Sequence, residues 1–268
     1  MLIVGGSVKG SPGETTFAVA LAARWAGPEP AVVVEADPAG GDLAKRFGHY
    51  PEPGLVALAT AGRRRGTGAP VVAQQLALGV DVVLAPAGQE ATETVSMLVR
   101  ESLDLLRAAA WQQALIMDVG RLDPASPAWP LLGEADVVLL VTRLSVEAVD
   151  ALDVRMPALA QAAGGYGRLR LVTVGDSPLG TDRILTGPAQ TVPVLAAVPE
   201  DRRGADVLSG RVRPGRGWTR LPLPRAARAA ALRLRDELTP SPVAPVVLAP
   251  RQRGALMGHR DQAAQVRP

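Results

Sequence analysis

The stretch Ser7-Val8-Lys9-Gly10-Ser11-Pro12-Gly13-Glu14-Thr15-Thr16 decides the fold of this chain. It follows an apolar run, LIVGG at residues 2–6, and opens a segment with a helical pattern. Glycines at such a strand-to-helix junction let backbone N–H groups converge on phosphate oxygens, and the helix N-terminus adds positive potential. A threonine hydroxyl beside the phosphates suits Mg²⁺. The stretch therefore predicts a phosphate-binding loop between a first strand and a first helix.

Further apolar runs rich in valine and leucine recur along the chain. Near-continuous apolar runs of this length are typical of parallel strands that are covered on both faces. Because helical patterns separate them, we predict an α/β fold: a doubly wound, mostly parallel sheet of about seven strands with helices on both faces. Besides LIVGG, the expected strands are AVVVEAD (31–37), VDVVLAP (80–86), ALIMDVG (114–120), ADVVLLVT (135–142), LRLVTVG (169–175) and VPVLAAV (192–198).

Three segments between these strands carry helix signals. The first, 15–25, opens with hydroxyl residues, and the second, 90–110, carries acids early and arginines late, which matches the helix dipole. The third, 145–163, has Ser145 as an expected N-cap and Gly164 as an expected stop. Pro157 inside it is expected to kink or split this helix.

The composition excludes several kinds of site. Cysteine is absent, which excludes disulfides, thiolate metal sites and cysteine nucleophiles. The two histidines, His49 and His259, lie in a loop-like stretch and in a tail, so a Ser-His-Asp hydrolase is not expected. The start of the sequence carries no secretory signal pattern, and no stretch is long and apolar enough for an integral membrane segment, so we expect a cytoplasmic protein. We predict one domain over 1–239 and a proline-rich, disordered tail over 240–268.

Positive charge is concentrated between residues 200 and 235. Ten arginines face three acids there, which is the strongest charge asymmetry in the chain. Such a stretch is either a solvated helical face or a surface that contacts nucleic acid non-specifically. The candidate DNA contacts are Arg202, Arg203, Arg211, Arg213, Arg216 and Arg220.

The glycine-rich stretch resembles the deviant Walker A motif, KGGxGKTT, of the ParA/MinD family of P-loop ATPases. Lys9, Gly10, Gly13, Thr15 and Thr16 match that motif, Ser11 replaces a glycine, and Glu14 replaces the second lysine. The alternative is a glycine-rich turn between strand and helix that holds no ligand. The resemblance implies the P-loop NTPase fold of the SIMIBI type, with ATP and Mg²⁺ as cofactors and a homodimer as the acting form.

In that family the first lysine reaches across the dimer to the partner's phosphates, and the second grips the phosphates of its own subunit. Lys9 matches the first. Glu14, at the second, reverses a charge beside a polyanion, and each unit pair is worth roughly 4 kcal/mol at about 4 Å and an effective dielectric near 20. If ATP binds, we expect Glu14 to turn outward and Arg121 or Arg143 to supply positive charge. The expected nucleotide-binding loop is Lys9, Gly10, Ser11, Pro12, Gly13, Glu14, Thr15 and Thr16.

Three later stretches resemble other marks of the family. VVVEADPAGGDLAKRFG (32–48) is similar to the switch I segment VxxxDxDPQxG, in which Asp37 matches the water-positioning second aspartate and Glu35 stands at the first. ALIMDVGR places Asp118 as a Walker B carboxylate, so Thr15 and Asp118 are the expected Mg²⁺ ligands, and Lys9 and Asp37 the catalytic residues. Where the family flanks adenine with an Asn and a proline, this chain has Asp176 and Pro199.

Three functional hypotheses follow. The first is an ATP-dependent dimerising switch, with weak or no hydrolysis, that positions DNA or a pilus or secretion machine. The second is a non-hydrolysing scaffold that keeps the fold and the dimer interface. The third, compatible with either, is a partition protein that binds DNA non-specifically. MinD-like partition proteins and CpaE/TadZ-like relatives are the subgroups of closest resemblance, and GGDLA after Asp37 favours the latter.

Overall fold

The computed structural model describes residues 1–62, 73–176, 185 and 187–238 of the 268-residue chain. Met1–Leu238 forms one compact unit. The predicted proline-rich tail, 240–268, lies outside the described residues, so its disorder stays a prediction.

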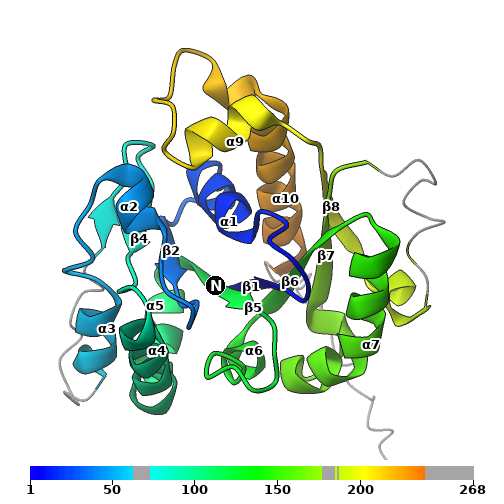
Figure 1. The fold of residues 1–268 in the computed structure, drawn as a ribbon, viewed down its shortest axis with the longest axis horizontal. Helices are drawn as coiled ribbons and strands as arrows, with labels where there is room; N and C mark the ends of the chain where they lie inside the picture. Colours follow the sequence, from blue (N-terminus) through cyan, green and yellow to red (C-terminus); the bar gives the residue numbers. More distant parts are fainter. Residues whose placement is uncertain (63–72, 177–184, 186, 239–268) are drawn as a thin grey trace, which may run out of the picture. The chain divides into compact units, whose positions relative to one another are not determined.

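Among the residues that the structure describes, eight strands form a single sheet in the order β3-β4-β2-β5-β1-β6-β7-β8 (Figure 1). Neighbouring strands are parallel except β3, which runs antiparallel to β4. This confirms the α/β prediction: each of the seven predicted runs contains a strand, and the unpredicted eighth, β3, has two residues. The strands are β1 (Leu2–Ser7), β2 (Ala31–Glu35), β3 (Gln74–Gln75), β4 (Asp81–Val83), β5 (Ala114–Arg121), β6 (Val137–Arg143), β7 (Leu169–Val174) and β8 (Val194–Val198).

Helices cover both faces of the sheet, and each face has its own hydrophobic core. One core packs the sheet against α3 (Leu55–Ala61), α4 (Gln89–Glu101), α5 (Leu103–Ala110), α6 (Leu131–Glu134) and α7 (Val146–Ala163). The other packs it against α1 (Glu14–Ala23), α2 (Leu43–Phe47), α9 (Arg202–Leu208) and α10 (Pro222–Leu238). Figure 1 shows α1, α9 and α10 on one side of the strands and α4, α6 and α7 on the other. Short 3₁₀ turns, η1 (Tyr166–Arg168), η2 (Gly187–Thr191) and η3 (Trp218–Arg220), join these elements.

The helix predictions were partly right. Ser145 caps α7, since its Oγ accepts a hydrogen bond of 3.3 Å from the Ala148 N–H, and Gly164 ends it with φ 76°. Pro157 does not split α7, which runs through it as one helix. The predicted helix over 90–110 is two helices, which meet at the buried Ser102; its hydroxyl donates to the Ala59 carbonyl at 3.2 Å.

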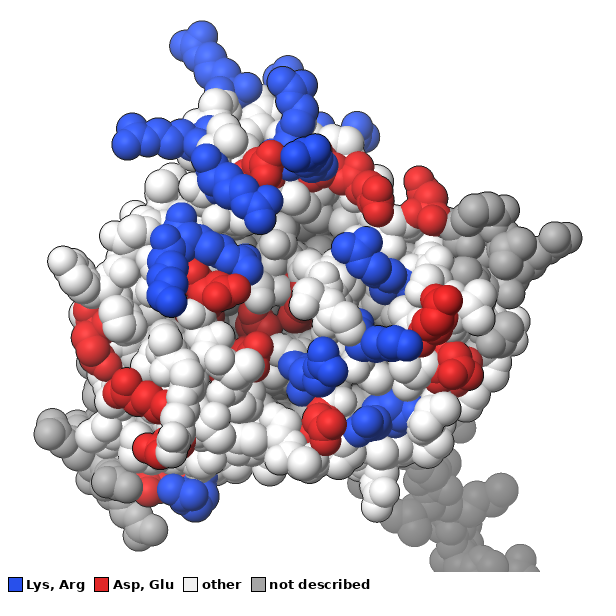
Figure 2. All heavy atoms as spheres, viewed as in Figure 1, with Lys and Arg blue, Asp and Glu red and all other residues white. Residues whose placement is uncertain are grey.

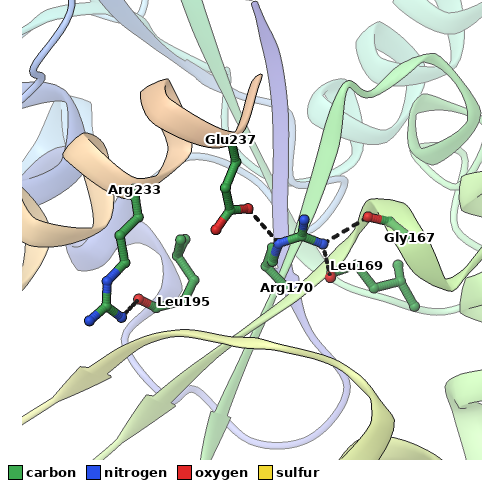
Figure 3. Close-up of polar contacts among 6 residues, drawn as sticks. All are labelled: Gly167, Leu169, Arg170, Leu195, Arg233 and Glu237. Carbon is green, nitrogen blue, oxygen red and sulfur yellow. Dashed lines mark hydrogen bonds and ion pairs between the residues drawn. The ribbon is translucent and has the colours of Figure 1, made fainter. Parts of the chain in front are cut away.

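Arginines of the basic stretch attach α10 to the rest of the unit. Arg233 donates to the carbonyl of Leu195 in β8 at 2.8 Å, and Glu237 accepts from Arg170 Nε at 2.8 Å (Figure 3). Arg228 and Arg235 donate to carbonyls that follow α1. The side chains of Arg228, Arg233 and Arg235 therefore stabilise the fold by hydrogen bonds to backbone carbonyls. None of the helices in the described residues is both long and apolar enough to cross a bilayer.

Candidate functional site

A cavity of about 450 Å³ opens at the carboxyl ends of β1, β2 and β5. Parallel α/β sheets bind ligands at this end of their strands. The phosphate loop, the segment after β2 and the segment after α9 together form its walls. The lining residues are Ser7, Gly10, Ser11, Pro12, Gly13, Glu14, Thr15, Thr16, Asp37, Ala39, Asp42, Arg46, Gly120, Arg121, Ala205, Ser209 and Arg211.

The loop backbone leaves the start of α1 free for an anion. Gly10 (φ 73°) and Gly13 (φ 101°) both adopt the left-handed conformation, which favours glycine. Gly13 is the N-cap of α1, and no side chain caps the first-turn N–H groups. Because uncapped N–H groups and the helix dipole attract negative charge, the loop has the local geometry of a phosphate site.

Glu14 turns inward, which corrects the expectation that it turns outward. Its side chain is buried, and a Cβ built on Gly5 of β1 would lie 2.3 Å from Glu14 Oε1, so the absence of a side chain at Gly5 makes room for this carboxyl. Glu14 Oε2 is buried without a hydrogen-bond partner among the described residues. Burial, and then the charge of Asp118, raise the pKa of Glu14 well above its ordinary value. Burial therefore favours the neutral form of Glu14.

Glu35 is a second buried carboxyl, and it organises the segment after β2. Its Oε1 accepts from the N–H groups of Asp42 and Leu43, both at 2.9 Å, and its Oε2 accepts from Ala85 N–H at 3.1 Å. It thereby joins the start of α2 to the segment after β4. Burial raises the pKa of Glu35 to about 7, against the opposing effect of these hydrogen bonds.

Asp118 follows four buried apolar residues of β5 and does not itself line the cavity. Thr15, which lines the cavity, donates its hydroxyl to Asp118, and Gly120 N–H donates to Asp118 Oδ1 at 3.1 Å. Burial raises the pKa of Asp118 to about 6, although both hydrogen bonds lower it. The hydroxyl and carboxylate oxygens fit Mg²⁺, which prefers hard oxygen ligands and takes few of them from protein when phosphates supply others. Among the described residues, no cluster of three or more His, Cys, Asp or Glu side chains could hold a metal by itself.

Asp37 lines the cavity next to Gly120. Its Oδ1 accepts from Ala39 N–H at 2.8 Å. A Cβ built on Gly120, where φ is 64°, would lie 2.2 Å from the Asp37 carboxylate, so only glycine permits this approach. Burial, then the charge of Asp42, raise the pKa of Asp37, whereas Arg121 and the Ala39 hydrogen bond lower it.

Three arginines from separate elements line the same cavity. Arg46 comes from α2, Arg121 from the end of β5 and Arg211 from the segment after α9. Arg46 pairs with Asp42 at 2.8 Å, and Arg211 pairs with Asp206 at 3.1 Å. Arg121 was predicted as a source of positive charge, and it lies in the cavity wall. Arg143, the other candidate, lies outside this wall and pairs with Glu200 at 3.6 Å.

The remaining residues that were predicted to bind nucleotide lie outside the cavity lining. Lys9 is exposed and does not line its own cavity. Asp176 and Pro199 follow the neighbouring strands β7 and β8, also outside the lining. The sequence did not lead us to predict Arg46 in the cavity, although the basic pair at 45–46 could have suggested it. Arg211 was predicted as a DNA contact, and it lines the cavity instead. The other candidate DNA contacts are exposed side chains of α9 and of the segment before α10, and Figure 2 shows basic side chains gathered there.

Comparison with protein-family models and with curated protein sequences found no match. Solved structures do match. The ParA family ATPase of Chlorobium tepidum TLS is 18% identical, with 86% of this chain and 98% of that one covered and a TM-score of 0.66. A chain of the MinC:MinD cell division complex of Aquifex aeolicus is 16% identical, with 88% and 96% covered and a TM-score of 0.64. The septum site-determining protein MinD of Pyrococcus horikoshii OT3, complexed with Mg-ADP, is 17% identical, with 89% and 98% covered and a TM-score of 0.63.

Proposed function

We propose that this chain, which has the fold of the ParA and MinD ATPases, is a nucleotide-binding positioning protein. It binds ATP with Mg²⁺, dimerises in that state, and hydrolyses ATP slowly or not at all. The observation that carries the proposal is the cavity itself: an uncapped glycine-rich loop, Thr15, Asp37 and Gly120 line one hollow at the ends of adjacent strands. Solved neighbours described as complexes with Mg-ADP and with ATP have the same fold.

Each residue has a distinct proposed role. The backbone N–H groups from Gly10 to Thr16, except at Pro12, which has none, bind phosphate oxygens. Thr15 and Asp118 hold Mg²⁺. Bound Mg²⁺ would neutralise charge on the phosphates. Asp37 positions the attacking water. Asp176 and Pro199 flank the base, by their resemblance to the family's strand ends.

The raised pKa of Glu14 favours its neutral form, and this weakens the electrostatic objection to ATP. A neutral carboxyl in place of lysine would remove one positive charge and add no negative one, so the unfavourable change would be about half of the two-charge reversal. Arg46, Arg121 and Arg211 line the cavity and offset part of that loss. The arginines supply the positive charge of the missing second lysine of the motif, but they lie at other positions. The site is therefore better suited to binding ATP than to hydrolysing it fast.

The exposure of Lys9 supports a role in a dimer. A lysine that does not line its own cavity is placed to serve another one, as the resemblance implies for the first lysine of the motif. We therefore propose that Lys9 stabilises phosphate charge across a homodimer.

Titration of ATP into the purified protein, with and without Mg²⁺, together with the mass in solution, tests the proposal. Glu14→Lys should tighten ATP binding by about tenfold or more, the effect of roughly 1.4 kcal/mol. Glu14→Gln is the matched control and should change affinity little, because burial favours the neutral form of Glu14. Absence of ATP binding to the wild type, even with Mg²⁺, would contradict the proposal.

Phosphate release separates the switch from the non-hydrolysing scaffold. Turnover that is lost in Asp37→Ala supports a weak ATPase. Intact ATP-dependent dimers without any turnover support the scaffold.

Non-specific DNA binding is the second candidate function. It is supported by exposed arginines of α9 and of the segment before α10, which are Arg202, Arg203, Arg213, Arg216 and Arg220. Figure 2 shows basic side chains gathered at one end of the molecule. Phosphate contacts of this kind lose affinity steeply as salt rises. Duplex DNA that binds with the same affinity at low and at high salt, or does not bind at all, would contradict this candidate. The cargo we propose is DNA or a pilus or secretion machine, positioned in the cytoplasm.

A further inference from the structure

A second hollow, of about 560 Å³, lies on the other side of α9 from the phosphate-loop cavity. Ala205 and Ser209, four residues apart, line the cavity. Arg203 and Val207, also four residues apart, line the second hollow. Residues four apart share one face of a helix, so α9 presents a different face to each space. The two sites are therefore separate, although a single helix forms a wall of both.

The second hollow has an apolar floor. Val207 of α9 is buried there, and Trp218 and Leu221 are half-buried opposite it. Val212 is 53% exposed and completes this apolar surface. A tryptophan and a valine that remain accessible within a hollow offer a site for an inserted apolar side chain.

The rim of this hollow is positive. Arg203, Arg213 and Arg216 line it, and among the described residues no ion pair or hydrogen bond engages their side chains. The one acid in the lining, Asp206, is already paired with Arg211 at 3.1 Å. The rim therefore carries uncompensated positive charge, and Figure 2 shows basic side chains projecting from this end of the molecule.

We propose that this hollow docks an acidic segment of a partner protein, which inserts an apolar side chain against Trp218. Tryptophan and arginine are the residue types that contribute most to protein interfaces, and an apolar centre inside a charged rim is the usual layout of such interfaces. Clusters of free arginines recognise acidic motifs.

Two other occupants fit the hollow less well. The chain's own segment 239–268 carries four arginines and one aspartate, so its charge has the same sign as the rim. Duplex DNA would complement the arginines, but a phosphate backbone has no group for the apolar floor. An acidic peptide with an apolar residue complements both parts of the surface.

Fluorescence anisotropy with a dye-labelled peptide tests this proposal. The probe is a Trp-Leu pair flanked on both sides by glutamates, and we expect saturable binding to the full-length protein. Val212→Asp, and Arg213→Glu combined with Arg216→Glu, should each weaken binding by about tenfold or more, as for the loss of an interface hot spot. All three side chains are exposed, so these variants should keep the fold, which circular dichroism verifies.

Arg202→Glu is the matched control, because Arg202 lies on α9 and is exposed but does not line the hollow. It should leave peptide binding within about twofold of the wild type, since exposed charges contribute little at a distance. Equal loss in Arg202→Glu and in the double variant, equal binding of a peptide with serines in place of Trp-Leu, or binding of duplex DNA alone would overturn the proposal. The measurement needs no nucleotide, so its result is independent of the proposed ATP site.

Discussion

Two buried glutamates near the cavity show how differently the fold can hold the same side chain. Glu35 has both carboxyl oxygens engaged by three backbone N–H groups, from Asp42, Leu43 and Ala85. Glu14 has a buried oxygen without a partner and fills the space that Gly5 leaves open. Burial raises the pKa of both. Glu35 therefore stabilises the backbone around the site, whereas we expect Glu14 to contribute little to its stability.

Substitution by methionine should separate the two glutamates most clearly, because the loss of unfolding free energy should be large at Glu35 and small at Glu14. Glu35→Met should lower the free energy of unfolding by about 4 kcal/mol at about pH 5, because it leaves three N–H groups without their acceptor and each buried orphan costs roughly 1–3 kcal/mol. Urea denaturation of the wild type and of Glu35→Met measures this loss. A loss below about 1 kcal/mol would show that other groups or water satisfy these donors.

Stability should also fall as pH rises. A carboxyl whose folded pKa is raised binds more protons when folded, so its stabilisation is fully present below the unfolded pKa of 4.5 and is lost as pH rises through about 7. Glu35 alone contributes on the order of 3 kcal/mol, and Asp118, with its pKa raised to about 6, adds a loss of the same sign. Denaturation between about pH 4 and pH 8 should give a shallower slope in Glu35→Met than in the wild type. Parallel slopes would contradict the assignment to Glu35.

Gly120→Ala tests how tightly Gly120 and Asp37 pack in the cavity wall. The new methyl group would lie against the Asp37 carboxylate in a backbone conformation that disfavours alanine, so we expect a loss of about 2 kcal/mol in unfolding free energy. Gly10→Ala is the control: its φ is also positive, at 73°, but no atom lies within 4 Å of the added carbon. Equal losses in the two variants would mean that the contact with Asp37 adds nothing.

The smallest effect is expected for Glu14→Met. This substitution removes a buried polar group without a partner and keeps the side-chain volume similar, so unfolding free energy should change by less than about 1 kcal/mol or rise slightly. Thermal melting of this variant beside Glu35→Met gives the comparison directly. A large loss of unfolding free energy in Glu14→Met would show that Glu14 stabilises the site as Glu35 does.

The sequence predicted the elements that depend on local pattern. Each apolar run became a strand, and the glycine-rich loop lies between β1 and α1 as expected. It did not predict the direction of Glu14, which depends on Gly5, a residue of the preceding strand. The role of Glu35 was missed for a similar reason, because Ala85 is 50 positions away in the sequence.

The arginines of the cavity could not be predicted from local pattern either. Arg46 and Arg211 line one wall only because α2 and the segment after α9 meet there. A Cβ built on Gly210 would lie 2.5 Å from the Arg46 carbonyl oxygen, which shows how closely these two segments approach. Such an approach follows from tertiary packing and leaves no periodic signal in the sequence.

The edges of the sheet also bear on how copies of this protein associate. An unpaired outer strand is a template on which another chain can add by backbone hydrogen bonding, which promotes aggregation. Within the described part of the chain, one edge is the two-residue strand β3, and at the other edge Arg233 donates to the carbonyl of Leu195 in β8. Both edges are therefore poor templates, and self-association by extension of the sheet is disfavoured.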